Sequence, residues 1–180
     1  MAFARLTSLV LLMLCTAVQA QTRVRGTIVA FDGVTLSVQG GGLIQVDDKT
    51  QIVFAEPIAL SDIRPGDFLG VTSVKAKDGM LTAYEVRRFP QALNPGHRPF
   101  DGRDDQTMTN ATVGAVVQSA SGRDLVLIYD GGTQQIKVPP EAAVSQLVPG
   151  NKGHLLPGAA VNLTHDPSGR ALRIQVSPKR

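Results

Sequence analysis

The sequence predicts an all-β fold, and three observations support this prediction. Glycine and proline together account for 29 of the 180 residues (18 plus 11), which leaves few stretches in which an α-helix could continue. Valine, isoleucine, leucine and threonine fall in short runs bounded by Gly, Pro or Asp, as is typical of small antiparallel strands. The same order of strands and turns also occurs in both halves of the chain.

The sequence predicts five or six short strands in the first half. Apolar and polar residues alternate from Val24 to Phe31, and the dipeptide Asp32-Gly33 that follows is the strongest short-range signal for a β-hairpin. A second turn is expected at the glycines of residues 40–42. Asp78-Gly79 then turns the chain into the last strand of this half.

The second half repeats this pattern with offsets of 88, 92 and 90 residues (114 minus 26, 155 minus 63 and 168 minus 78). The matched features are Gly26 with Gly114, Ile63–Gly66 with Leu155–Gly158, and Asp78-Gly79 with Ser168-Gly169. Because the offsets differ by less than the length of a loop, they indicate an internal duplication of one small β unit. The alternative is convergence on common turn dipeptides.

Closing each unit into a barrel removes the exposed edges of an open sheet, which favours two tandem small antiparallel β-barrels with OB-like topology. The expected organisation is a signal peptide at 1–20, a first barrel at 21–88, a docked connector at 89–111, a second barrel at 112–177 and a tail at 178–180. One helical turn is expected between Ala55 and Asp67, with Ser61 as its cap.

The first twenty residues have the order of a secretory signal peptide: Arg5 near the start, an apolar block from Leu9 to Leu14, and Ala20 at the cleavage site. The block is shorter than the roughly 20 residues that cross a bilayer, so no membrane span is expected after cleavage. The mature chain is therefore expected to be periplasmic or secreted, in a bacterium. A lipoprotein attached through Cys15 is the alternative, although Leu14 stands where such a site requires a small residue.

Composition excludes several classes of function. Cleavage would remove Arg5 and the only cysteine, which leaves 17 basic residues (18 minus 1) against 15 acidic ones and a net charge of about +2. Such scattered charge does not favour a polyanionic partner, and the few aromatic residues fall in strand registers that a core would claim, so no nucleic-acid binding is expected. Without cysteine, a disulfide scaffold and a thiolate nucleophile are excluded.

The strings GTIVAFDGVTLSV, IRPGDFLGV and DGMLTAYEV resemble the exported bacterial domain of unknown function 5666, a family drawn as a small β-barrel. The resemblance covers Val24 to about Val86 well and the second half loosely, and it implies a fold and an exported location but no activity. The same order of strands is also similar to the periplasmic copper-efflux chaperone, which binds copper through His, Met and an aromatic ring. This chain departs from that pattern, because it has no Trp and no strand set with a His and two nearby methionines.

The stretch NPGHRPFDGRDDQTMTN at residues 94–110 carries the candidate site. A flexible spacer would be served by Gly and Ser, whereas this stretch concentrates charged, aromatic and sulfur-containing side chains. Three interpretations stay open: a docked structural connector, a ligand or partner site, and a flexible hinge. The candidate contacts for an unknown protein or small ligand are His97, Arg98, Phe100, Asp101, Arg103 and Met108.

Neither catalysis nor a cofactor is predicted. No GxSxG elbow surrounds a serine, and the paired carboxylates at residues 47–48 and 104–105 fall in turns. The three histidines show no metal-binding spacing, so His97 and Met108 are only weak metal candidates. The leading hypothesis is a non-enzymatic, exported two-barrel binding or structural module. The alternatives are a periplasmic metal-handling protein that uses the 94–110 stretch and, more distantly, a hydrolase.

We expect the mature protein to begin at Gln21, because Ala20 is the small residue that signal peptidase requires before the cleaved bond. Intact-mass spectrometry of exported material measures this directly. Exported protein that retains Met1 would contradict the prediction of export by this route.

Overall fold

The computed structural model describes residues 21–119 and 122–179, so the predicted signal peptide lies outside the described residues. Within that part of the chain the fold is all-β, with a 13-stranded mixed sheet and no α-helix. Two short 3-10 turns occur, η1 (Leu60–Asp62) and η2 (Lys152–His154). The turn η1 falls in the stretch predicted to hold one, but its cap is Ala59 rather than Ser61. No helix among the described residues is long and apolar enough to cross a membrane.

The strands are short except for the eighth. In chain order they are β1 (Thr22–Phe31), β2 (Thr35–Val38), β3 (Gly42–Gln45), β4 (Gln51–Pro57), β5 (Phe68–Lys75), β6 (Leu81–Phe89), β7 (Gly96–Phe100), β8 (Arg103–Ser119), β9 (Gly122–Tyr129), β10 (Gly132–Val138), β11 (Ala143–Pro149), β12 (Ala160–His165) and β13 (Ala171–Ser177).

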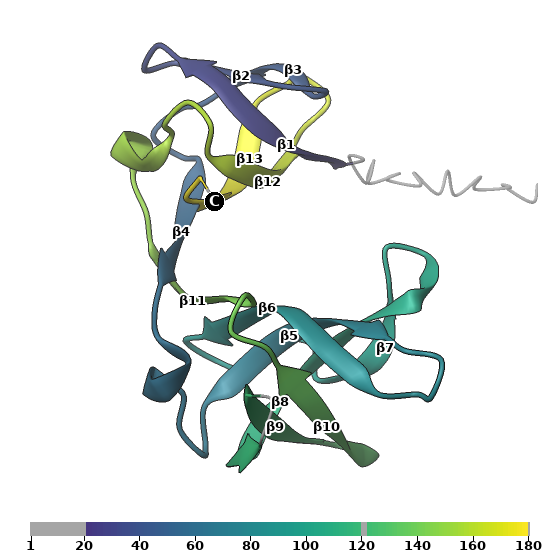
Figure 1. The fold of residues 1–180 in the computed structure, drawn as a ribbon. Coiled ribbons are helices and arrows are strands. Elements are labelled where there is room, and N and C mark those ends of the chain that lie inside the picture. Colours follow the sequence, from purple (N-terminus) through teal and green to yellow (C-terminus); the bar gives the residue numbers. More distant parts are fainter. Residues whose placement is uncertain (1–20, 120–121, 180) are drawn as a thin grey trace, which may run out of the picture.

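Figure 1 shows two lobes that β4 and β11 join along one side. The lower lobe is a ring in which β8, β5 and β6 are neighbours, and β9 and β10 complete it because β10 pairs with β6 at Ile136 and Leu81. The upper lobe contains β1, β2, β3, β12 and β13, and a single bridge from Gln45 to Arg170 brings β3 to the start of β13. Its ring is therefore only partly closed. Purely antiparallel barrels were expected, but β10–β6, β11–β6 and β13–β4 pair in parallel.

The strand pairing crosses the predicted boundaries at 21–88 and 112–177. The hairpin of β5 and β6 pairs with β8 and β10 of the second half, and β1 pairs with β12. The physical reason lies in β4 and β11, which run antiparallel with Ala55 opposite Leu147 and carry the chain from one lobe to the other. Each ring therefore takes strands from both halves. Residues 21–88 and 112–177 as the limits of two domains therefore remain a prediction.

Each lobe has its own hydrophobic core, and each core also combines both halves of the chain. Strand alternation turns every second side chain inward, so the core residues recur at that period. The upper core contains Ile28, Leu36, Val38, Ile44, Val46, Leu155, Ala159, Val161, Leu163, Ala171, Ile174 and Val176. The lower core contains Ile63, Leu69, Val71, Leu81, Ala83, Val86, Ala111, Val113, Leu125, Leu127, Ile136 and Val138.

The predicted connector at 89–111 contains regular structure. Its strand β7 pairs with the first part of β8, and the turn between them has Asp101 at φ 55° and Gly102 at φ 68°, which are type I′ values. Pro99 is tolerated because β7 is an edge strand that, among the described strands, pairs only with β8. The absence of apolar alternation in this stretch therefore did not indicate a loop.

Gly26 and Gly114 lie where the first strand of each half changes partners. Strand β1 pairs with β12 as far as Thr27 and with β2 beyond it, and β8 passes in the same way from β5 to β9. A Cβ atom on Gly26 would lie 2.4 Å from the backbone oxygen of Gln39, whereas one on Gly114 would lie 2.6 Å from the Cδ1 atom of Ile128. The side chain of Ile128 can rotate away from an added Cβ atom, whereas the backbone of Gln39 cannot.

Gly26→Ala should therefore lower the free energy of unfolding by roughly 2 to 3 kcal/mol, and Gly114→Ala by roughly 1 kcal/mol or less. Urea unfolding of the two variants and of the unmodified protein measures both values. Equal losses would contradict the idea that backbone contact at Gly26 sets the larger cost.

Candidate functional site

The β7–β8 hairpin separates the two weak metal candidates. His97 lies opposite Thr109, and Arg98 lies opposite Met108. Cross-strand partners share a face of the sheet while consecutive residues alternate, so His97 and Met108 project from opposite faces. They do not converge on one ion. Among residues 21–119 and 122–179, no three side chains of His, Cys, Asp or Glu are grouped so that they could hold a metal.

His97 covers one end of the lower ring. Its Nδ1 atom is 2.8 Å from the hydroxyl of the buried Thr109, and its ring stacks on Tyr129 with centroids 6.5 Å apart. Burial, and to a smaller extent the charge of Lys75, holds the pKa of His97 below its usual value. A neutral, stacked and hydrogen-bonded imidazole at this place has a structural role.

Three more of the predicted residues interact within the lower lobe. Arg98 donates to the backbone oxygen of Asn94 at 3.1 Å, and Met108 Sδ lies 4.0 Å from the hydroxyl of Thr72. Arg103 donates to both carboxylate oxygens of Asp105 at 3.0 and 2.9 Å, which lowers the pKa of that carboxyl. The two arginines are therefore used to hold the hairpin together.

The tip of the hairpin connects the lobes. The guanidinium of Arg25, on β1 of the upper lobe, lies 5.3 Å from the ring centroid of Phe100 and forms an ion pair with Asp101. Phe100 is half-buried. Of the three interpretations of residues 94–110, these contacts fit the docked connector.

A small cavity of about 220 Å³ lies between the lobes beside this contact. Its charged side chains have ion-pair partners: Arg87 lies 2.6 Å from Glu85, and Arg25 pairs with Asp101 of the hairpin tip. Burial, and next the charge of Glu85, raises the pKa of Tyr84, so its phenol stays neutral. The charges of this cavity are thus balanced without a ligand.

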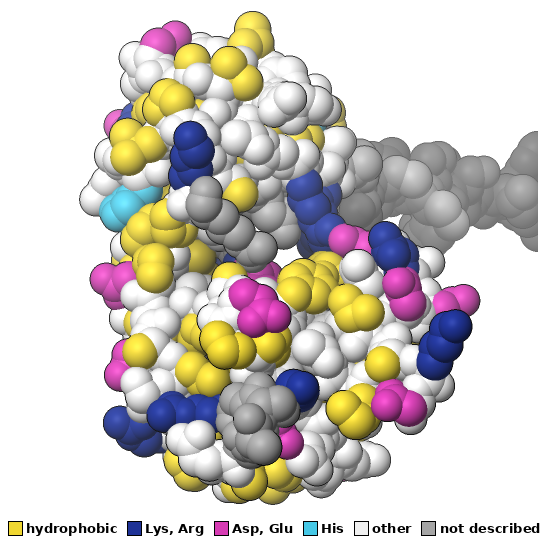
Figure 2. Space-filling view, viewed as in Figure 1, with side chains coloured by type: hydrophobic (Ala, Val, Ile, Leu, Met, Phe, Trp, Pro, Cys, Tyr) yellow, Lys and Arg dark blue, Asp and Glu magenta, His cyan; other side chains and the backbone are white. Residues whose placement is uncertain are grey.

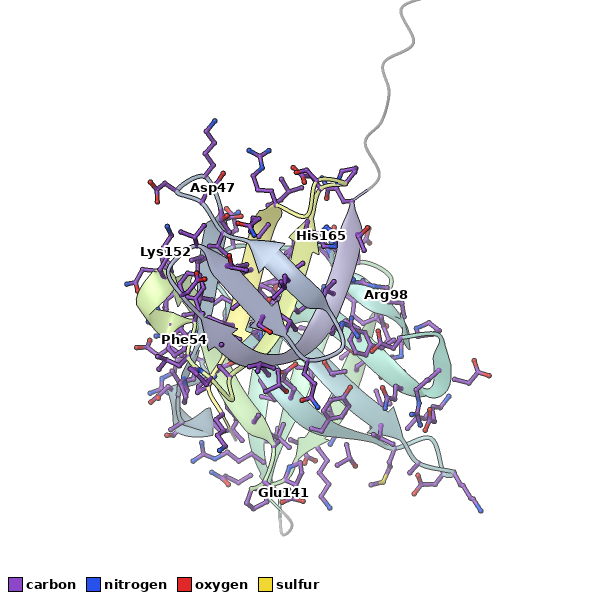
Figure 3. The ribbon with its side chains drawn as sticks, turned by 90° about the horizontal axis from the view of Figure 1, so that it is seen from above. Asp47, Phe54, Arg98, Glu141, Lys152 and His165 are labelled. Carbon is purple, nitrogen blue, oxygen red and sulfur yellow. The ribbon has the colours of Figure 1, made fainter. Side chains whose placement is uncertain are left out.

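A larger pocket, of about 410 Å³, lies against β4 and β11. Along β4, Ile52 and Phe54 pack against the upper core, whereas Val53 and Ala55 face the other way and form a small cluster with Leu147. Figure 3, seen from above, places Phe54 of β4 and Arg98 of β7 on opposite sides of the molecule. In Figure 2, hydrophobic side chains gather on the side where β4 and β11 join the lobes.

Three neighbouring strands form the floor of this pocket, and a short segment forms its wall. The register places Arg173 of β13 beside Gln51 of β4, and Val53 of β4 opposite Pro149 of β11. The wall is formed by Phe89, the last residue of β6, and by the segment that follows it, residues 90–93. The complete lining is Gln51, Ile52, Val53, Phe89, Pro90, Gln91, Leu93, Leu147, Val148, Pro149 and Arg173.

The sequence does not reveal this pocket, because its residues come from separate segments that meet only through strand pairing. One signal was present. Residues 52–55 are four consecutive apolar residues, Ile-Val-Phe-Ala, and an uninterrupted apolar run indicates a strand with two covered faces. That signal marks β4 as a strand between two layers, but it does not identify the second layer.

Arg25→Ala and Phe100→Ala should each release the hairpin tip and speed trypsin cleavage after Arg103 several-fold. Each change removes a cation–π contact worth about 0.5 to 1 kcal/mol, and Arg25→Ala also removes an exposed ion pair worth about 0 to 1 kcal/mol. Arg23→Ala, in the same strand, is the matched control and should leave the rate unchanged. Rapid cleavage of the unmodified protein at this place would instead indicate a hinge.

Comparison with known proteins adds no relative: no family model, no curated protein and no solved structure matches the chain. The resemblances to the exported domain of unknown function and to the copper-efflux chaperone therefore stay predictions that rest on the strings quoted above.

Proposed function

We propose that this chain is a non-enzymatic binding module, exported to the periplasm or secreted by a bacterium, and that its ligand occupies the apolar pocket beside β4 and β11. The observation that carries the proposal is the pocket itself, of about 410 Å³ and lined mostly by apolar side chains. Ligand sites commonly measure about 300 to 1,000 Å³, have few polar groups and lie between structural units.

The composition of the lining favours binding over catalysis. It contains no Ser, Thr, Cys, His, Asp, Glu, Lys or Tyr, so it offers neither a nucleophile nor a group that exchanges protons near neutral pH. Its one charged side chain is Arg173, whose guanidinium offers hydrogen-bond donors and no acceptor. Contact with apolar atoms supplies the driving force, at about 0.8 kcal/mol for each methylene that leaves water.

We also propose that the two halves are copies of one β unit that have exchanged their final hairpins. Supporting this, β4 and β11 begin at 51 and 143, η1 and η2 at 60 and 152, and β5 and β12 at 68 and 160, so each difference is 92 residues. Ala55 and Leu147 are also 92 residues apart and lie opposite each other, as expected beside a two-fold axis. Superposing the two halves of a crystal structure tests this relation.

The proposed function is tested by titrating the mature protein with octan-1-ol and following methyl signals by NMR. The signals of Val53, Leu93 and Leu147 should shift in a saturable way, with a dissociation constant of about 1 mM or tighter. Leu93→Gln should weaken this binding, because Leu93 is 42% exposed at the pocket and its change need not disturb a core.

Ile128→Gln is the matched control, since Ile128 is 51% exposed on β9 and does not line the pocket. It should leave octanol binding unchanged. Shifts that do not saturate, or that are the same in the Leu93→Gln protein, would contradict the proposed site.

A further inference from the structure

We propose that the pocket beside β4 and β11 takes an alkyl carboxylate, with the carboxylate on Arg173 and the hydrocarbon chain along the strand face; this inference rests on the proposed function. Arg173 lies at the edge of the pocket, on β13, between Gln51 of β4 and Thr164 of β12. Its side chain is exposed, so a ligand can reach the guanidinium without a rearrangement of the core.

Among the described residues, no carboxylate forms an ion pair with Arg173. Arg25 pairs with Asp101, Arg87 with Glu85, and Arg88 with Asp67. The remaining ion pairs of the described chain involve Arg103, Lys152 and Arg170. The guanidinium of Arg173 is therefore available for an acceptor from outside the chain.

The charge of the lining selects an anion. Arg173 is its only charged residue, so a cationic ligand would meet repulsion and no attraction. A guanidinium binds a carboxylate through two parallel N–H donors, a geometry that a hydroxyl group cannot use. Gln51 and Gln91, which also line the pocket, add neutral amide donors for the same oxygens.

The register of the strands orders the pocket from polar to apolar. On one face of β4, Gln51 beside Arg173 is followed by Val53 opposite Pro149 and then by Ala55 opposite Leu147. These four residue steps span about 13 Å, which is long enough for a chain of eight carbons. A carboxylate at Arg173 thus directs the chain along β4 toward Phe89, which packs against the cluster of Val53, Ala55 and Leu147.

The test compares octanoate with octan-1-ol, which has the same chain length but no charge, on the mature protein. Octanoate should bind about fivefold more tightly than octanol, as expected for an exposed ion pair. Arg173→Gln should abolish this preference, so that octanoate and octanol bind with equal affinity. Arg23→Gln is the matched control, because Arg23 is exposed, lies in the same row across the sheet through Thr164, and does not line the pocket.

Each outcome decides one of the two proposals. Equal binding of octanoate and octanol would overturn the role of Arg173 but leave the apolar binding site standing. An equal loss of octanoate binding in the Arg23→Gln and Arg173→Gln proteins would also overturn it, because general positive charge would then explain the preference. If neither compound binds, both the carboxylate site and the proposed function are wrong.

Discussion

The antiparallel pairing of β4 with β11 is the interaction on which the rest of the structure depends. Each of these strands is paired on both sides, since β4 also pairs with β13 of the upper lobe and β11 with β6 of the lower lobe. The pairing therefore joins the two lobes through a continuous set of backbone hydrogen bonds. It also fixes which hairpin reaches which lobe, because β5 follows β4 and β12 follows β11 on opposite sides of the junction.

The opposite side of the molecule is held by weaker interactions. There the contact of Arg25 with Phe100 and Asp101 is made by side chains, and those of Arg25 and Asp101 are 39% and 42% exposed. Exposed contacts of this kind contribute about 1 kcal/mol or less each. The backbone pairing of β4 with β11 consequently determines how the lobes are connected, and the β7–β8 hairpin adds a side-chain contact between them on the other side.

Local features were predictable from the sequence, and strand partners were not. The turns Asp32-Gly33 and Asp78-Gly79 lie between β1 and β2 and between β5 and β6, because Gly at positive φ is required wherever such a tight turn occurs. The alternating residues of β5 predict a strand but do not specify its partner, which in the structure is β8. The hairpin at 94–110 was recognised as unusual, but its mostly polar faces concealed the two-residue period of its strands.

Because both lobes contain strands from both halves of the chain, the candidate site is linked to the stability of the whole chain. The upper core contains residues 28–46 and 155–176, and the lower core contains residues 63–86 and 111–138. Unfolding of either half of the chain would therefore remove part of both cores. The pocket floor, formed by β13, β4 and β11, lies between these cores. A ligand that binds only the folded chain stabilises it by RT ln(1 + [L]/Kd), so the stabilisation rises with the free ligand concentration. Because the lobes share strands, that stabilisation acts on both lobes rather than on the one nearest the pocket.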